Sequence, residues 1–157
     1  MIELSIPIEM ISEARVLASK LGVLKLSISK GRGNLYGFIG ELLFNSVVNG
    51  THKNTYDYDI ILKDGSTVDV KTKKTTVKPL PHYVCTVPAY NTKQECDNYG
   101  FVRVRDDLSV GWVLGMMPKK EFIENAIFMD KGEQNGRYIN KRACYNVKIE
   151  DLHAIQK

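Results

Sequence analysis

Cysteine is scarce in this chain of 157 residues, and tryptophan occurs once. The three cysteines, Cys85, Cys96 and Cys144, are odd in number and widely spaced. Such spacing suits a reducing compartment better than a disulfide framework, and no C-x-x-C pair indicates a zinc site. We therefore expect neither disulfides nor structural zinc.

The sequence also lacks a long apolar run. No stretch is long enough to cross a bilayer, and the N-terminus has none of the features of a signal peptide. We expect no membrane partner and a cytoplasmic location, which is the host cytoplasm if a virus encodes the chain. Because there is no internal repeat and no linker, residues 1–157 should form a single domain.

What is present is an ordinary composition for a soluble globular protein. Hydrophobic residues make up 43% of the chain and charged residues 25%. The length allows a proper core to be buried. The formal net charge of +4 permits a polyanionic partner without requiring one.

The most informative stretch is residues 56–74, which is typical of a β-hairpin. Two alternating segments, Tyr56–Leu62 and Ser66–Lys73, flank Lys63-Asp64-Gly65. Both segments carry β-branched or aromatic residues, and Asp-Gly between such segments is a strong hairpin signal.

The length of the turn decides which residues face each other. A two-residue turn pairs Asp59 with Val70 and divides the charges between both faces. A three-residue turn, with Gly65 in the left-handed conformation, pairs Asp59 with Asp69 instead. We prefer the second register because it keeps one face apolar. The apolar face then holds Tyr58, Ile60, Leu62, Val68 and Val70, and the charged face holds Asp57, Asp59, Asp69 and Lys71, with Asp57 opposite Lys71.

The charged face predicts a divalent cation site. Like charges opposite each other on a sheet are destabilising unless they are neutralised. Mg²⁺ prefers oxygen ligands and is usually held by one or two carboxylates with water and phosphate. The alternative is a solvated face on which acids and lysines pair weakly.

An acid on one strand followed by acid-x-lysine on the next, here Asp59 and Asp69-Val70-Lys71, resembles the PD-(D/E)XK nuclease superfamily. Many members add a glutamate on the preceding helix, and Glu41 matches it. The resemblance covers about residues 33–87. No proline precedes Asp59, which leaves Asp57 as a competitor for the same role.

The resemblance implies an α/β fold with a restriction-endonuclease-like core, in which a mixed β-sheet is flanked by α-helices and the hairpin strands are central. It implies Mg²⁺ or Mn²⁺ held by Glu41, Asp59 and Asp69, with the backbone carbonyl of Val70 as a further ligand. Lys71 would then stabilise negative charge on the transition state.

The implied activity is metal-dependent hydrolysis of phosphodiester bonds in DNA. The family includes restriction enzymes, repair nucleases and Holliday-junction resolvases. A short chain with no evident recognition domain favours structure-directed or non-specific cleavage, and a homodimer would supply two symmetric sites. Two alternatives stay open, which are a non-catalytic nucleic-acid-binding module of the same fold and an RNA-directed nuclease.

Two basic segments, residues 24–34 and 72–81, flank the acidic centre and offer cations to nucleic-acid phosphates. For the first segment a solvated loop is an equal alternative. His82 lies at the start of a predicted strand and is a candidate nucleic-acid contact. The cations in question are Lys25, Lys30, Arg32, Lys73, Lys74 and Lys78.

The rest of the chain predicts alternating helices and strands. Gly37 and Gly40 lower helix stability, which suggests close approach to a strand or a ligand. Predicted helices cover 7–22, 35–48 and 119–126, and a last helical turn covers 150–155. Predicted strands cover 82–88, placed centrally, 99–105 and 110–117 as a second hairpin, and 145–149, with an exposed loop over 127–141.

Overall fold

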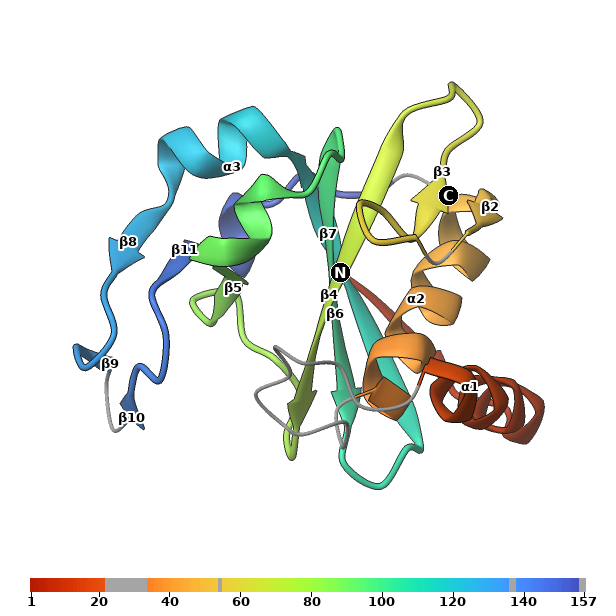
Figure 1. The fold of residues 1–157 in the computed structure, drawn as a ribbon. Helices are drawn as coiled ribbons and strands as arrows, with labels where there is room; N and C mark the ends of the chain where they lie inside the picture. Colours follow the sequence, from red (N-terminus) through yellow and green to blue (C-terminus); the bar gives the residue numbers. More distant parts are fainter. Residues whose placement is uncertain (22–33, 54, 136–137, 156–157) are drawn as a thin grey trace.

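A computed structural model describes residues 1–21, 34–53, 55–135 and 138–155 (Figure 1). In this part of the chain a six-stranded sheet lies at the centre, in the order β1-β7-β6-β4-β3-β2. Strands β4 and β6 are parallel and the other neighbours are antiparallel, so the predicted mixed sheet is confirmed. The strands are Ile2–Ser5 (β1), Thr51–His52 (β2), Ile60–Ile61 (β3), Thr67–Thr75 (β4), Asn98–Arg105 (β6) and Val110–Pro118 (β7).

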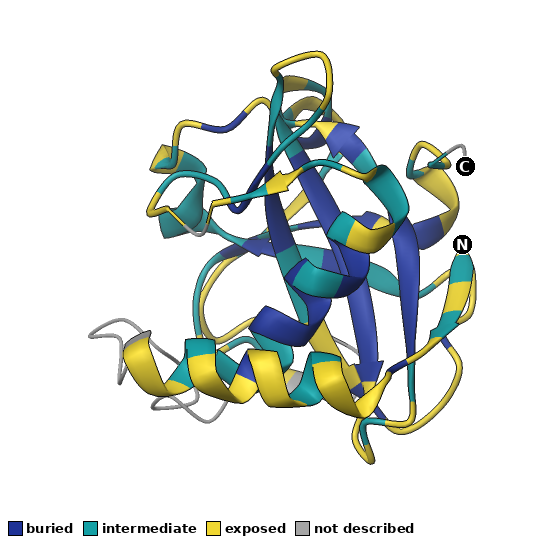
Figure 2. Cartoon of the chain, turned by 90° about the vertical axis from the view of Figure 1, so that its right-hand side faces the viewer, coloured by how far each residue is buried: buried dark blue, intermediate teal, exposed yellow. Residues whose placement is uncertain are grey.

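Helices α1, Ile8–Leu21, and α2, Asn34–Val48, lie on one face of this sheet (Figure 1). Helix α2 packs on the sheet and α1 packs on α2, so the outward side of α1 is exposed (Figure 2). Apolar residues at helical spacing form the buried stripe of α2, which stabilises the helix through tertiary packing. The stripe consists of Phe38, Ile39, Leu43 and Phe44, and it meets Ile60, Val68, Val70, Val102, Val104 and Val113 of the sheet.

Gly40 allows α2 to approach β4 closely. A Cβ atom at Gly40 would lie 1.9 Å from the Thr72 hydroxyl oxygen, so no larger residue fits there without movement. The predicted close approach to a strand is therefore confirmed at Gly40. A Cβ at Gly37 would meet nothing within 4 Å, so no strand that the structure describes approaches there, and the alternative of a ligand at Gly37 stays a prediction.

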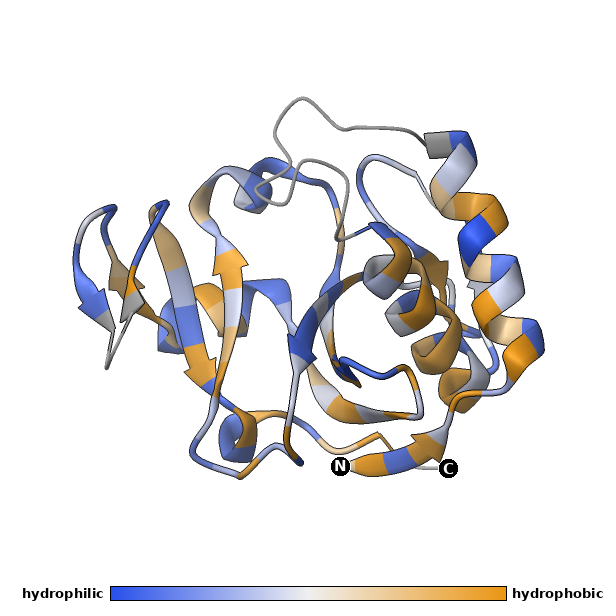
Figure 3. Cartoon of the chain, turned by 90° about the horizontal axis from the view of Figure 1, so that it is seen from below, coloured by the Kyte–Doolittle hydropathy of each residue, from blue (hydrophilic) through white to orange (hydrophobic). Residues whose placement is uncertain are grey.

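The other face of the main sheet is covered by a second, three-stranded sheet in the order β5-β11-β8, with helix α3, Lys119–Asn125. Viewed from below, this layer and the α1–α2 layer lie on opposite sides of the main sheet (Figure 3). A separate core fills the space, built on Tyr99, Phe101 and Phe122. The strands are Val84–Pro88 (β5), Ile127–Met129 (β8) and Cys144–Lys148 (β11).

Several predicted elements are placed differently by the structure. Residues 82–88 were expected to be a central strand, but β5 is an edge strand of the second sheet. Residues 127–141 were expected to be a loop, but they contain β8 and a small antiparallel pair, Gln134–Asn135 (β9) and Tyr138–Ile139 (β10). Strand β1 was not predicted. Helices flank one face of the main sheet, whereas the other face is covered mainly by strands.

The predicted hairpin register is confirmed. Ile60 pairs with Val68, and the Leu62 N–H donates to the Ser66 carbonyl at 2.8 Å. Gly65 has a φ of 86°, which is the left-handed conformation that a three-residue turn requires. The strand pairing begins at Ile60. Just before it, the Asp59 N–H donates to the Val68 carbonyl at 2.9 Å, so the predicted pairing of Asp59 directly with Asp69 does not form.

The first arm of the hairpin is shorter than predicted. The Thr55 hydroxyl oxygen accepts from the N–H groups of Asp57 and Tyr58, at 3.3 and 3.0 Å. This local bond holds a bend where a strand was expected. As a result Tyr58 packs against the second core, so its predicted place beside Ile60 is wrong.

The remaining expectations concern cysteines and membrane spans. All three cysteines are buried and free. Among the described residues, no helix is both long enough and apolar enough to span a membrane.

Candidate active site

Asp59 is the centre of the candidate site. It directly precedes β3 and is only 8% exposed. Its Oδ2 accepts from the Val70 N–H at 2.7 Å, which fixes the carboxylate against β4. Its own backbone N–H donates to the Val68 carbonyl at 2.9 Å, so both its main chain and its side chain are held by β4.

The surroundings of Asp59 oppose its ionisation. Burial raises the pKa of its carboxyl well above the ordinary value, and the negative charges of Glu41 and Asp69 raise it further. The Val70 N–H and the Lys71 ammonium act in the opposite direction but are weaker. Helix α2 and β4 therefore bring the carboxylates of Glu41 and Asp69 within electrostatic reach of Asp59.

This charge cluster predicts a pH-dependent loss of stability. Below the ordinary pKa of 3.8, Asp59 is protonated in both states and carries no penalty. As the pH rises above that value, the unfolded chain ionises first, so the free energy of unfolding falls until the pH passes the raised pKa of the folded state. Asp59→Asn should therefore raise the melting temperature at pH 7 by at least about 2–4 °C, the shift that about 1 kcal/mol produces in a domain of this size.

The measurement is thermal unfolding in EDTA at pH 4 and pH 7, with Asp64→Asn as control. Hydrogen bonds from Ser66 lower the pKa of Asp64, which is the opposite direction. The control should therefore give no gain at pH 7. An Asp59→Asn variant that is no more stable than the parent at pH 7 would contradict the electrostatic description of the site.

Glu41 is held by a histidine that the sequence analysis did not identify. Glu41 is 8% exposed on α2, and its Oε2 lies 2.7 Å from Nε2 of His52 on β2. The two residues are only 11 positions apart, but nothing in the sequence indicates that a two-residue strand returns to the helix. The contact fixes the Glu41 carboxylate on the side of α2 that faces the hairpin.

Asp69 and Lys71 project from the same face of β4. The Lys71 ammonium lies 2.6 Å from Oδ2 of Asp69, and both side chains are largely buried. The ammonium also donates to Oε1 of Gln94 at 3.3 Å. The Gln94 amide in turn donates to the Tyr56 carbonyl at 2.5 Å, so Gln94 ties Lys71 to the bend before β3. Gln94 was also missed, because it lies in a polar connection 23 residues away.

Asp57 does not face Lys71, and the predicted pairing is wrong. Its Oδ1 accepts from the Glu95 N–H at 3.0 Å. The bend held by Thr55 turns Asp57 out of the strand pairing, so it anchors the segment that carries Gln94. Of the two competing aspartates, Asp59 is the one that lies among the other carboxylates.

The residues fit a divalent cation in charge and in donor type. Glu41, Asp59 and Asp69 offer hard carboxylate oxygens, and the buried Asp59 lies near the like charges of Glu41 and Asp69. In the parts of the chain that the structure describes, no three His, Cys, Asp or Glu groups are drawn together closely enough to form a finished ligand set. Glu41 and Asp69 instead contact His52 and Lys71.

The predicted basic contacts are distributed over different surfaces. Lys25, Lys30 and Arg32 lie outside the described residues. Lys78 is exposed and forms an ion pair with Glu3 at 2.8 Å. Lys74 lies over the Tyr36 ring of α2, at 5.4 Å from its centre.

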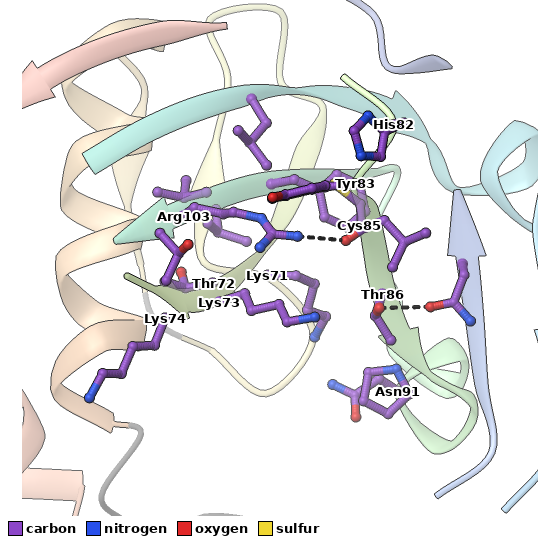
Figure 4. Close-up of a pocket in the computed structure, with 18 of the residues that line it drawn as sticks. Lys71, Thr72, Lys73, Lys74, His82, Tyr83, Cys85, Thr86, Asn91 and Arg103 are labelled. Atoms are coloured by element: carbon purple, nitrogen blue, oxygen red, sulfur yellow. Dashed lines mark hydrogen bonds between the residues drawn. The ribbon is translucent and has the colours of Figure 1, made fainter. Parts of the chain in front are cut away.

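Lys73 differs from these residues because its side chain points across a cleft (Figure 4). The cleft, of about 1220 Å³, lies between β4 and β6 on one side and β5 and β11 on the other. Lys71 and Lys73 point across this cleft toward Thr86 and Asn91, whereas Lys74 points away (Figure 4). Atoms around Lys73 partly desolvate its ammonium, and together with the charge of Arg103 this lowers its pKa. His82 also lines the cleft, at the end near Tyr83.

Compared with known proteins, the chain matches no family model and no curated protein.

Proposed function

We propose that this protein is a divalent-metal-dependent nuclease that hydrolyses phosphodiester bonds in nucleic acid, with DNA as the first expected substrate. The observation that carries the proposal is the position of Asp59. A buried carboxylate with a raised pKa, next to Glu41 and Asp69, is an unfavourable arrangement for folding alone. Groups with strongly perturbed pKa values are frequent at functional sites.

The cofactor expected here is Mg²⁺ or Mn²⁺, with Glu41, Asp59 and Asp69 as ligands and the Val70 carbonyl as a further candidate. When bound, such an ion supplies Lewis-acid chemistry and acidifies a water molecule. The protein's own contribution begins with Asp59, whose carboxylate is oriented by the Val70 N–H. Val70 therefore fixes the position of one acid and lies between Asp69 and Lys71 on β4.

Lys71 is suited to electrostatic stabilisation of a phosphate. Asp69 and Gln94 hold its ammonium, and Lys71 is the lining residue of the cleft that contacts Asp69. An ammonium in that position can donate to a non-bridging phosphate oxygen as negative charge develops there. His52 and Gln94 act as positioning residues, because each contacts one member of the set from outside it.

A restriction-endonuclease-like core and a homodimer belong to the same proposal. The order β7-β6-β4-β3, with β4 parallel to β6 and α2 packed on β4, supports such a core. A non-catalytic nucleic-acid-binding module is the second candidate. It is favoured by the contacts of Glu41 with His52 and of Asp69 with Lys71, which occupy two carboxylates with protein partners.

The experiment that tests the proposal is a cleavage assay on linear, circular, single-stranded and branched DNA, and on RNA. Each substrate is incubated with Mg²⁺, Mn²⁺, Ca²⁺ or EDTA. We expect cleavage with Mg²⁺ or Mn²⁺ and none with EDTA. Equal activity in excess EDTA would refute the metal-dependent mechanism, and binding without cleavage under every condition would identify the protein as the binding module.

A further inference from the structure

The cleft between the two sheets differs in chemistry from one wall to the other. The wall formed by β4 and β6 carries the cations Lys71, Lys73 and Arg103, and also Lys74, which points away from the cleft. The opposite wall, formed by β5, β11 and the segments next to them, carries uncharged hydrogen-bonding side chains. These are Thr86, Asn91, Asn140 and Asn146.

Two amides on the uncharged wall have unused hydrogen-bonding capacity. Within the described residues, the Asn91 Oδ1 and the Asn140 Nδ2 have no hydrogen-bond partner and less than 1 Å² of accessible surface, so their side chains must rotate into the cleft to bind a ligand. A buried polar atom without a partner costs free energy, and a ligand that supplies one recovers it. One of these atoms is an acceptor and the other a donor, which is the combination that the edge of an unpaired base can satisfy.

The cationic wall is suited to a phosphate backbone. Lys73 points across the cleft from β4, one strand repeat beyond Lys71 (Figure 4). Because residues two apart on a strand share a face, these ammonium groups form a row that leads to Asp69. A strand that follows this row would reach Asp69, one of the proposed catalytic carboxylates, through Lys71.

The cleft is too narrow for a duplex. The Arg103 side chain crosses from β6 and donates to the Val84 carbonyl on β5 at 3.0 Å. Lys71 similarly reaches Gln94 at 3.3 Å. A gap that a single side chain crosses is narrower than a double helix and cannot admit one. The volume of about 1220 Å³ nevertheless exceeds the roughly 300–1,000 Å³ of a pocket for one small molecule.

We propose that this cleft binds an unpaired nucleic-acid strand, with its phosphates on Lys71 and Lys73 and its bases toward Asn91 and Asn140. The inference rests on the proposed nuclease function and specifies its substrate as a single strand, a flap or a frayed end. The Arg103 guanidinium lies over the Tyr83 ring, at 5.3 Å from its centre. DNA and RNA share the required chemistry.

The test is equilibrium binding of a fluorescent 12-nucleotide strand, as DNA and as RNA, and of the matching DNA duplex, all in EDTA. Cleavage plays no part in this measurement, so failure of the nuclease proposal and failure of the cleft proposal are separable. We expect at least about tenfold tighter binding of the single strand than of the duplex. The DNA and RNA arms distinguish the two sources of the strand.

Two variants separate the contribution of the two walls. Lys73→Ala should weaken single-strand binding and reduce the slope of log affinity against log salt by about 0.7, because one phosphate contact is lost. The double variant Asn91→Ala, Asn140→Ala should weaken binding about tenfold and leave the slope unchanged. Lys120→Ala removes an exposed charge from α3 and should change neither quantity.

Three results would overturn the proposal. The first is a duplex that binds as tightly as the single strand. The second is a double asparagine variant that is folded by circular dichroism and binds like the parent. The third is a protein that binds a mononucleotide but does not bind the 12-nucleotide strand. That result would make the cleft a small-ligand site.

Discussion

Replacing Asp69 with asparagine is expected to reduce cleavage by at least about 1,000-fold. The variant keeps the size of the side chain and removes the charge that lies 2.6 Å from the Lys71 ammonium. If Asp69 is a metal ligand, the loss includes the stabilisation of transition-state charge, which is worth several kcal/mol, and each 1.36 kcal/mol is a tenfold change in rate. The measurement is single-turnover cleavage with Mg²⁺ in excess.

Binding and folding should respond differently from activity in this variant. Lys71 loses an ion-pair partner, but it keeps Gln94, and Asp59 loses a like charge that raises its pKa. These effects oppose each other, so we expect the melting temperature to change little. Affinity for a polyanion in EDTA should stay equal or increase, because one negative charge is removed next to the cleft.

The matched control for this experiment is Asp106→Asn. Asp106 lies in the exposed turn between β6 and β7, and the same substitution there should leave cleavage unchanged. If Asp69→Asn cleaves at the full rate and both it and the parent still require the metal, Asp69 is not a ligand. Loss of cleavage together with loss of the folded state would instead show that the Asp69–Lys71 pair is needed for stability.

The hairpin was predictable because its information is local. Asp64-Gly65 between two alternating segments determines both the turn and the register in which Ile60 pairs with Val68, and this brings Asp59 against β4. The same holds for the α2 stripe and for the β6–β7 pair, where periodicity and a turn signal lie within a few residues of each other.

The parts that could not be predicted depend on contacts between distant segments. Residues 82–88 have the same apolar pattern whether they lie in the main sheet or in a second one. Pairing with β11, which lies about 60 residues later in the chain, places β5 in the second sheet. Gln94 and His52 likewise reach the site only through the tertiary fold.

One error had a local signal that was overlooked. Thr55 precedes the hairpin, and a threonine hydroxyl that binds the N–H groups two and three residues on stabilises a bend instead of a strand. That bend is the reason that Asp57 leaves the charged face. Because of the bend, Asp57 holds the Glu95 N–H, whereas Asp59 lies near Glu41 and Asp69. The two aspartates therefore have different predicted roles.

The two aspartates can be distinguished by the same substitution at both positions. Asp59→Asn should abolish cleavage, again by at least about 1,000-fold, because a neutral amide cannot supply the charge that a divalent cation requires. The variant should fold, since the amide oxygen still accepts from the Val70 N–H and one buried like charge is removed. Its loss of activity would therefore have no explanation in unfolding.

Asp57→Asn should retain most of the activity, because the oxygen that accepts from the Glu95 N–H is preserved. Asp57→Ala removes that acceptor and loosens the segment that holds Gln94 against Lys71, so we expect about a tenfold loss, which Asp57→Asn avoids. Single-turnover rates and thermal melts of all three variants give the comparison. An inactive Asp57→Asn together with an active Asp59→Asn would place the metal at Asp57, and the site would then have to be rebuilt around the bend at Thr55.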